Sequence, residues 1–198
     1  MCIRDSHDID ETIQQTPADQ IAKGLGLEDN LFQVGSTSKI TLAGSGISFI
    51  SSSTENLSKF IDFRNAITPG PNKMNQGMHV KYFESVSIEQ QMNELKKIIK
   101  PKFELVDDIL KPLKDSGLCS YEKPTGGYFY SIDSAKSNAD EIVQNCSDLG
   151  LKLLPMGSCF PYGKDPDKKN IRLAPTFPDL ASLERCVSIF KNVLKYLN

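Results

Sequence analysis

The stretch LFQVGSTSKITLAGSGISF, residues 31–49, predicts two short strands around a turn. Apolar and β-branched residues in LFQV (31–34) and GISFISSS (46–53) give way to glycine and serine on the turn side. Lys39 is therefore expected on a loop at a strand edge, among small hydroxyl residues and glycines. A solvated surface charge is the ordinary interpretation of one loop lysine, so the question is whether its amine has a chemical role.

The residues beside Lys39 indicate what such a role could be. A lysine amine can form a Schiff base with a carbonyl compound. Ser36 and Ser38, with the backbone N–H groups of a glycine-rich turn, could hold a phosphate and so place a phosphorylated aldehyde beside the amine. The four-residue pattern alone leaves both this hypothesis and the solvated-lysine interpretation open.

Two helices are predicted after the turn. Apolar spacing predicts one over 56–65, which the prolines and glycine of TPGPN (68–72) end. Ser87 begins the longest periodic segment, with Gln90 as its capping-box partner. Pro101 is expected to kink this second helix rather than end it.

Beyond Gly117 the pattern changes to alternating short strands and helices, which indicates a small α+β unit. The expected elements are a strand in 126–133, a helix over 138–149, a strand in 151–155, a strand in 170–177 and a helix from Asp179.

Composition excludes several classes of protein. The 198 residues carry a net charge of -2 with no run of five or six like charges, so neither nucleic acid nor a membrane surface is an expected partner. Five widely spaced cysteines without a CxxC pair favour a reducing cytoplasm over a disulfide framework. No apolar run is long enough for a membrane helix, and His7 and His79 lack a third ligand at metal spacing.

Several blocks occur in an order that resembles a known family. FQVGSTSKITLAGSGISF, EKPTGGYFYSID, LGLKLLPMGSCFPYG and NIRLAPTFP occur in the order and at about the spacing of fold type I pyridoxal-phosphate aminotransferases. STSKITLAGSG, GPNKMNQGMHV and FPYGKDPDKKNIRLAPTFP are similar to signature blocks of one branch of that family. The closest resemblance is to the aspartate-aminotransferase-like branch that is named for MocR-type regulators, and it covers nearly everything after about His7.

The resemblance implies an α/β fold made of three parts. Residues 1–68 would be the C-terminal part of the large cofactor-binding domain, and 69–117 an interdomain segment with a long bridging helix. Residues 118–198 would be the small α+β domain.

The resemblance also implies roles for four residues. Lys39 would bind pyridoxal 5′-phosphate covalently, with Ser36 and Ser38 at its phosphate. Arg172, in NIRLAP, would bind the substrate carboxylate, for which a guanidinium fork is better suited than an ammonium. A surface arginine on an edge strand is the alternative interpretation. Most relatives carry an arginine shortly after the lysine to pair with the cofactor phosphate, and ITLAGSGIS has none.

The implied function is amino transfer from an amino acid, with aspartate as the first expectation, to a 2-oxo acid in a cytoplasmic homodimer. Two alternatives stay open. One is an effector-sensing domain of a MocR-type transcription regulator. The other is a different fold type I pyridoxal-phosphate enzyme, such as a lyase.

The expected extent of the protein also comes from the resemblance. The phosphate loop, the ring-stacking aromatic residue and the aspartate that pairs with the ring nitrogen all precede the lysine in the family. The sequence is therefore expected to be the C-terminal part of a longer enzyme and to be inactive alone. Residues 1–6, MCIRDS, resemble translated adapter sequence and are expected to be non-native, so Asp5 is given no role.

Overall fold

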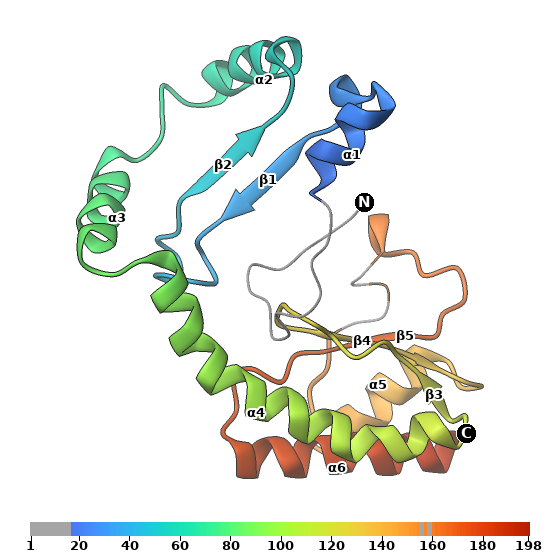
Figure 1. Ribbon diagram of the computed structural model, residues 1–198. Coiled ribbons are helices and arrows are strands. Elements are labelled where there is room, and N and C mark those ends of the chain that lie inside the picture. Colours follow the sequence, from blue (N-terminus) through green and yellow to red (C-terminus); the bar gives the residue numbers. More distant parts are fainter. Residues whose placement is uncertain (1–16, 155–156, 158–159) are drawn as a thin grey trace. The chain divides into compact units, whose positions relative to one another are not determined.

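The computed structural model describes residues 17–154, 157 and 160–198, which divide into two compact units (Figure 1). We call 17–95 the N-terminal unit and Lys96–Asn198 the C-terminal unit. Helix α4 (Ile88–Asp115) begins in the first and continues into the second. The family-level divisions after residues 68 and 117 stay a prediction.

The N-terminal unit contains a two-stranded antiparallel ribbon, preceded by helix α1 (Ala18–Leu25) and the short 3₁₀ helix η1 (Glu28–Asn30). Strands β1 (Gln33–Ser36) and β2 (Ser48–Ser51) pair with Gly35 opposite Phe49. Both predicted strands are confirmed, although β1 begins and ends two residues later than LFQV. Residues 37–47 connect them and contain Lys39 (Figure 1).

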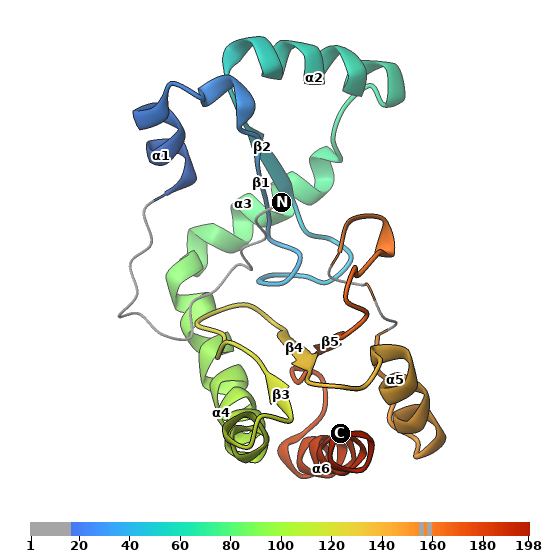
Figure 2. The same ribbon diagram turned by 90° about the vertical axis from the view of Figure 1, so that its right-hand side faces the viewer.

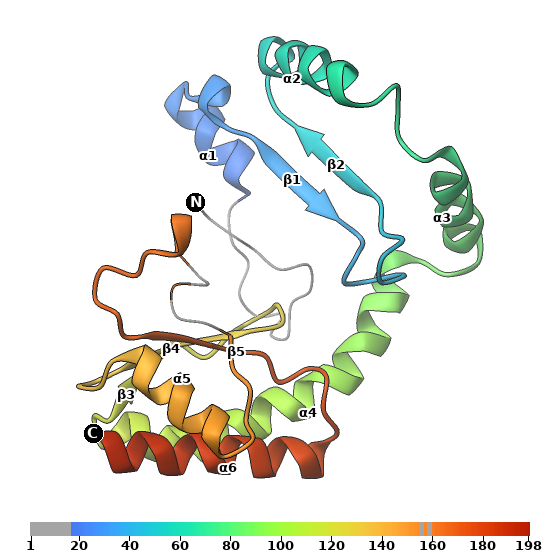
Figure 3. The same ribbon diagram turned by 180° about the vertical axis from the view of Figure 1, so that it is seen from behind.

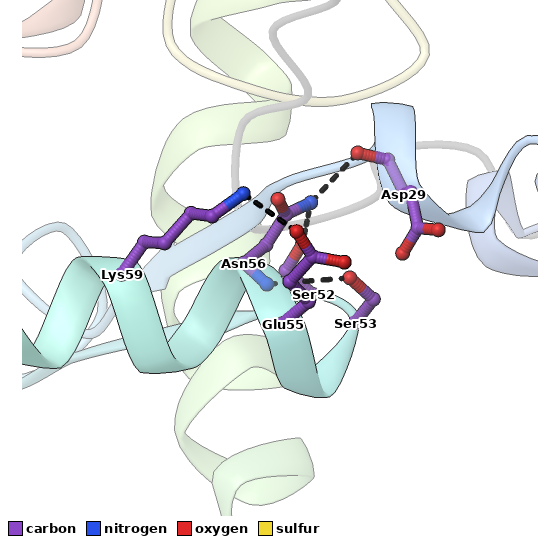
Figure 4. A network of polar contacts seen from close by, with 6 residues as sticks. All are labelled: Asp29, Ser52, Ser53, Glu55, Asn56 and Lys59. Atoms are coloured by element: carbon purple, nitrogen blue, oxygen red, sulfur yellow. Dashed lines mark hydrogen bonds and ion pairs between the residues drawn. The ribbon is translucent and has the colours of Figure 1, made fainter.

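Helix α2 (Thr54–Ile67) begins in a network of polar contacts that Figure 4 shows. The Ser53 hydroxyl caps the helix by accepting from the Asn56 backbone N–H, and the Asn56 side chain donates to the Asp29 carbonyl at 2.7 Å. The Asn56 amide also donates to the Ser52 hydroxyl, while Lys59 pairs with Glu55 one turn earlier. The predicted helix over 56–65 is confirmed, and η1 is tied to its start.

Helix α3 (Lys73–Ser85) was not predicted from the sequence. Its N-terminus is capped by Asn72, whose side chain accepts from the Asn75 backbone N–H. The following turn contains the predicted capping box of α4, because the Ser87 N–H donates to the Gln90 side chain and the Gln90 N–H donates to the Ser87 hydroxyl. Helix α4 then continues through Pro101 as expected.

The C-terminal unit is a three-stranded antiparallel sheet with helices on one face (Figures 2 and 3). The strands lie in the order β3 (Cys119–Ser120), β4 (Tyr130–Ser134) and β5 (Asn170–Leu173). Helices α5 (Ala139–Asp148) and α6 (Leu180–Leu197) lie on the same face as the second half of α4. Asn138 and Asp179 cap α5 and α6, which confirms both predicted helix starts.

The core of the C-terminal unit lies between the sheet and these helices. Tyr130, Ile132 and Ile171 come from the strands, and Phe103 and Phe190 come from α4 and α6; all five are at most 1% exposed. The Tyr130 hydroxyl donates to the Phe103 carbonyl at 2.8 Å, and burial raises the pKa of this phenol. Within the described residues, no helix is both long enough and apolar enough to cross a membrane.

The predicted strand over 151–155 is wrong for the four residues that the structure describes, 151–154, which form no strand; Pro155 lies outside the described residues. Gly150 has a left-handed φ of +85° and ends α5, and the Leu151 N–H then donates back to the Cys146 carbonyl at 2.8 Å. Leu151 is therefore buried beside the helix end rather than in the sheet. The strand predicted over 170–177 is confirmed only as far as Leu173.

Candidate functional site

Lys39 lies in the turn that directly follows β1, as the sequence predicts. We call residues 37–47 the lysine turn. The Ile40 and Thr41 N–H groups both donate to the Thr37 carbonyl, at 2.9 and 2.8 Å, so residues 37–41 form a hydrogen-bonded turn that contains Lys39. The Lys39 side chain is exposed, while Ile40 beside it is buried. Lys39 therefore lies at an exposed position of a turn whose backbone is anchored.

The hydroxyl groups of Ser36 and Ser38 lie together where β1 ends and the lysine turn begins. The oxygens of Ser36 and Ser38 are 2.7 Å apart, and the Ser38 backbone N–H donates to the Ser36 hydroxyl at 3.2 Å. Both side chains are exposed, so a bound anion could accept from either hydroxyl. The structure thus brings together three of the four residues singled out in the sequence.

Thr37 has a different role from the two serines. Its backbone N–H donates to the Ile47 carbonyl at 2.9 Å, and its hydroxyl accepts from the Ile47 N–H at 3.0 Å, so the two ends of the turn are joined. Gly46 allows this closure, because a Cβ there would lie 2.6 Å from both the nitrogen and the Cα of Ser38. A side chain at position 46 would force the Ser38 backbone away.

Helix α3 contacts the turn through a buried histidine. His79 is 2% exposed, and its Nε2 lies 3.2 Å from the Thr37 hydroxyl and 2.9 Å from the Thr41 hydroxyl. Its Nδ1 lies 2.9 Å from the Asn75 carbonyl oxygen, which can only accept, so Nδ1 carries a proton. In the neutral ring Nε2 is then an acceptor for a threonine hydroxyl.

Two amide side chains add contacts to the backbone of the turn. The Asn75 amide donates to the Gly46 carbonyl at 3.3 Å. The Gln91 amide, from the start of α4, donates to the Ile40 carbonyl at 3.0 Å and accepts from the Tyr82 hydroxyl at 2.6 Å. Two backbone carbonyls that follow Lys39 are therefore bound by side chains far away in the sequence.

Arg172 lies on β5 in the C-terminal unit, half-buried between the buried Ile171 and Leu173. Register places it opposite the exposed Ser131, on the sheet face that points away from the core residues Ile171 and Leu173. The guanidinium carbon lies 3.4 Å from the centre of the Phe129 ring. This cation–π contact restrains the position of the Arg172 guanidinium.

Sequence reasoning missed several of these residues, among them His79, Phe129 and Thr37. His79 stands in the quoted GPNKMNQGMHV block but was considered only as a metal ligand, and Phe129 and Thr37 were given no role. The i, i+4 spacing of Asn75 and His79 on one helix was the available signal. His7 lies outside the described residues, and within them no cluster of three or more histidine, cysteine or acidic side chains could hold a metal.

Comparison with known proteins identifies the family to which this arrangement corresponds. The model of the family "Aspartate amino-transferase" matches residues 7–195, which is almost the entire chain. The chain belongs to the aspartate aminotransferase family. The expected membership and the fold class, part of a fold type I enzyme, are thereby confirmed, whereas the MocR-type branch stays a prediction.

Individual family members agree with this assignment. Aspartate aminotransferase of Corynebacterium glutamicum is 35% identical over 166 residues, which are 83% of this chain and 38% of that protein. The crystal structure of a Corynebacterium diphtheriae protein named as an aminotransferase has a TM-score of 0.86 at 35% identity, and the match covers 96% of this chain and 48% of that one. The chain thus spans less than half the length of these relatives.

A more distant structure shares the fold. The α-aminoadipate aminotransferase of Thermus thermophilus, solved with N-(5′-phosphopyridoxyl)-L-leucine, matches 96% of this chain with a TM-score of 0.79 at 17% identity. At this identity the likeness shows the fold alone.

Proposed function

We propose that this chain supplies the covalent lysine and the carboxylate-binding arginine of a pyridoxal-phosphate-dependent aminotransferase. The observation that carries the proposal is the grouping of Ser36, Ser38 and Lys39 where β1 meets the lysine turn, in a chain that belongs to the aspartate aminotransferase family. Since the relatives are more than twice as long as the matched region, the activity is proposed for a protein of that length.

The residues of the turn fit the cofactor. Lys39, at an exposed position, would supply the amine for the aldehyde, and the hydroxyls of Ser36 and Ser38 would donate to the phosphate. The Thr37 hydroxyl, in contrast, is occupied by the Ile47 N–H and His79. When bound, pyridoxal phosphate supplies an electron sink for the negative charge that develops at the substrate Cα.

The chain's own groups then have distinct tasks. Lys39 would hold the cofactor and, once displaced by substrate, move a proton from the substrate Cα as a general base. Arg172 would bind the α-carboxylate through two parallel N–H···O bonds, with its position restrained by Phe129. Aspartate is the proposed amino donor and a 2-oxo acid the acceptor, which the name of the C. glutamicum relative supports.

We also propose that the enzyme is located in a reducing cytoplasm and forms a homodimer. Cys119, Cys146 and Cys186 are free thiols, and burial raises the pKa of Cys146 to about 11. Such thiols fit a reducing compartment. The dimer rests on the family resemblance and would be tested by sedimentation of the active enzyme.

The experiment requires a protein of family length. We suggest a hybrid in which residues 17–195 replace the matching segment of the C. glutamicum enzyme. Incubation with pyridoxal 5′-phosphate and borohydride, followed by peptide mapping, should place one pyridoxyl group on Lys39, and Lys39→Ala should remove it. Conversion of aspartate and 2-oxoglutarate to oxaloacetate and glutamate would distinguish transfer from lyase chemistry. A folded hybrid labelled only elsewhere would refute the assignment.

A further inference from the structure

The lysine turn is held from outside by one helix and the residues that follow it. Asn75, His79 and Tyr82 all lie on α3, and Gln91 lies in the first turn of α4. Asn75, His79 and Gln91 reach the hydroxyls of Thr37 and Thr41 and the carbonyls of Ile40 and Gly46, over 2.9–3.3 Å. The Tyr82 hydroxyl donates to the Gln91 side chain at 2.6 Å. The contacts bracket Lys39 on both sides.

The central group in this arrangement is His79, because it is the only one of the four that is buried. Its Nδ1–H is bound to the Asn75 carbonyl of its own helix, which fixes the ring tautomer and directs Nε2 to the turn. The two hydroxyls near Nε2 belong to residues placed symmetrically about Lys39, two before and two after it. A shift of the ring would therefore move the segment that carries the amine.

We propose that His79 is a positioning residue, which fixes the backbone of the lysine turn and thereby sets where the Lys39 amine is presented. This role rests on the proposed function of Lys39. His79 touches neither the amine nor the paired serines in the contacts described, so it would act through Thr37 and Thr41.

Packing alone cannot account for this arrangement. The turn has one buried apolar side chain, Ile40, and its neighbour Leu42 is 56% exposed. Helix α3 exposes Met74, Met78 and Val80 by 48–79%. Polar contacts therefore determine how α3 and the turn fit together, and of these the His79 contacts are the most shielded from water.

Two conservative substitutions separate positioning from space filling. Glutamine places its terminal amide near the position of Nε2, so His79→Gln can still bond the threonine hydroxyls. Asparagine places its amide near Nδ1, so His79→Asn keeps the contact with the Asn75 carbonyl but cannot reach the turn. Val80→Ala is the matched control, because Val80 is 61% exposed on the same helix.

Amide hydrogen exchange of the 198-residue chain tests the contact without any cofactor. We expect exchange of the Ile40, Thr41 and Ile47 amides to be roughly fivefold faster in His79→Asn, the effect of about one lost hydrogen bond. His79→Gln and Val80→Ala should behave as the unaltered chain, and Thr41→Val should resemble His79→Asn. Equal exchange in all variants, or no measurable protection in the unaltered chain, would overturn the proposal.

The link to Lys39 is tested with limiting pyridoxal 5′-phosphate and borohydride on the same proteins. The ratio of label on Lys39 to label on Lys59, an exposed lysine of α2 paired with Glu55, should fall roughly threefold in His79→Asn and recover in His79→Gln. A loosened turn with an unchanged ratio would show that His79 is only structural. The expected exchange effects with label absent from Lys39 throughout would overturn the link to the amine and leave the contact intact. The proposed function is tested separately, by labelling of the hybrid enzyme.

Discussion

The two units of this chain are stabilised in different ways. The eleven largest side chains with less than 2% exposure all lie in the C-terminal unit, in α4, β4, α5, β5 and α6. In the N-terminal unit only Ala22, Ile40 and His79 are buried among the described residues, while Val34 and Phe49 of the ribbon are 73% and 66% exposed. Arg172 thus belongs to a sheet backed by an apolar core, whereas Lys39 belongs to a turn held mainly by hydrogen bonds.

The largest expected effect tests this contrast in packing directly. Phe190→Ala, at a fully buried position of α6, should lower the free energy of unfolding of the C-terminal unit by about 3–5 kcal/mol. Phe49→Ala should cost less than about 1 kcal/mol, because its ring covers Gly35 but faces water. Denaturant titration followed by circular dichroism measures both, and similar losses would break the comparison.

The second prediction concerns the arginine that the C-terminal core supports. Arg172→Lys in the hybrid enzyme should reduce kcat/KM by about 2–5 kcal/mol of transition-state binding, since an ammonium cannot form two parallel bonds to a carboxylate. Steady-state kinetics with aspartate provide the measurement. An unchanged kcat/KM would mean that Arg172 is an ordinary edge-strand residue.

A third, smaller effect depends on pH. Burial favours protonation of Asp107, but hydrogen bonds from Lys123 and Tyr121 outweigh it and keep the carboxyl pKa below its ordinary value of 3.8. Because the folded-state pKa is lowered, the network stabilises the C-terminal unit above about pH 3.8 and is lost as the pH falls below that value.

Asp107→Asn should therefore cost about 1 kcal/mol at pH 7, for the loss of hydrogen bonds to a charged group that is partly exposed to solvent. The difference from the unaltered chain should shrink towards pH 3. Denaturant midpoints at pH 7, 5 and 3 give the comparison, and a constant difference across this range would contradict the assignment.

The smallest effect is expected in the N-terminal unit. Ser53→Ala removes the cap of α2 and should destabilise that helix by about 0.5–1 kcal/mol, at the low end for such caps because its bond to the Asn56 N–H is 3.4 Å long. Amide exchange in α2 reports the change. Faster exchange in the C-terminal unit as well would show that the two units unfold together.

Local signals in the sequence predicted where α4, α5 and α6 begin. The Ser87–Gln90 capping box and the caps at Asn138 and Asp179 depend on residues at most three apart, so their pattern is visible without the fold. Helix α3 was missed because only one of its residues, His79, is buried, and it has no continuous apolar stripe. The prediction of a strand was wrong for residues 151–154, because strand pairing is a long-range contact that an apolar run does not specify.

The same limit applies to the candidate site. Ser36, Ser38 and Lys39 are neighbours in sequence, so a motif could indicate them together. The contact between Thr37 and His79 joins residues 42 positions apart, and that between Gln91 and Ile40 joins residues 51 apart. Such contacts follow from the folded arrangement of α3 and the turn, which sequence patterns did not reveal.

The central claim is that Lys39 is the lysine that binds the cofactor. Borohydride reduction of the hybrid enzyme with pyridoxal 5′-phosphate, followed by peptide mapping, tests it most directly. We predict one pyridoxyl group per chain on the peptide containing Lys39, absent in Lys39→Ala and retained in Lys59→Ala. Stoichiometric label on another lysine in a folded, active hybrid would contradict the account.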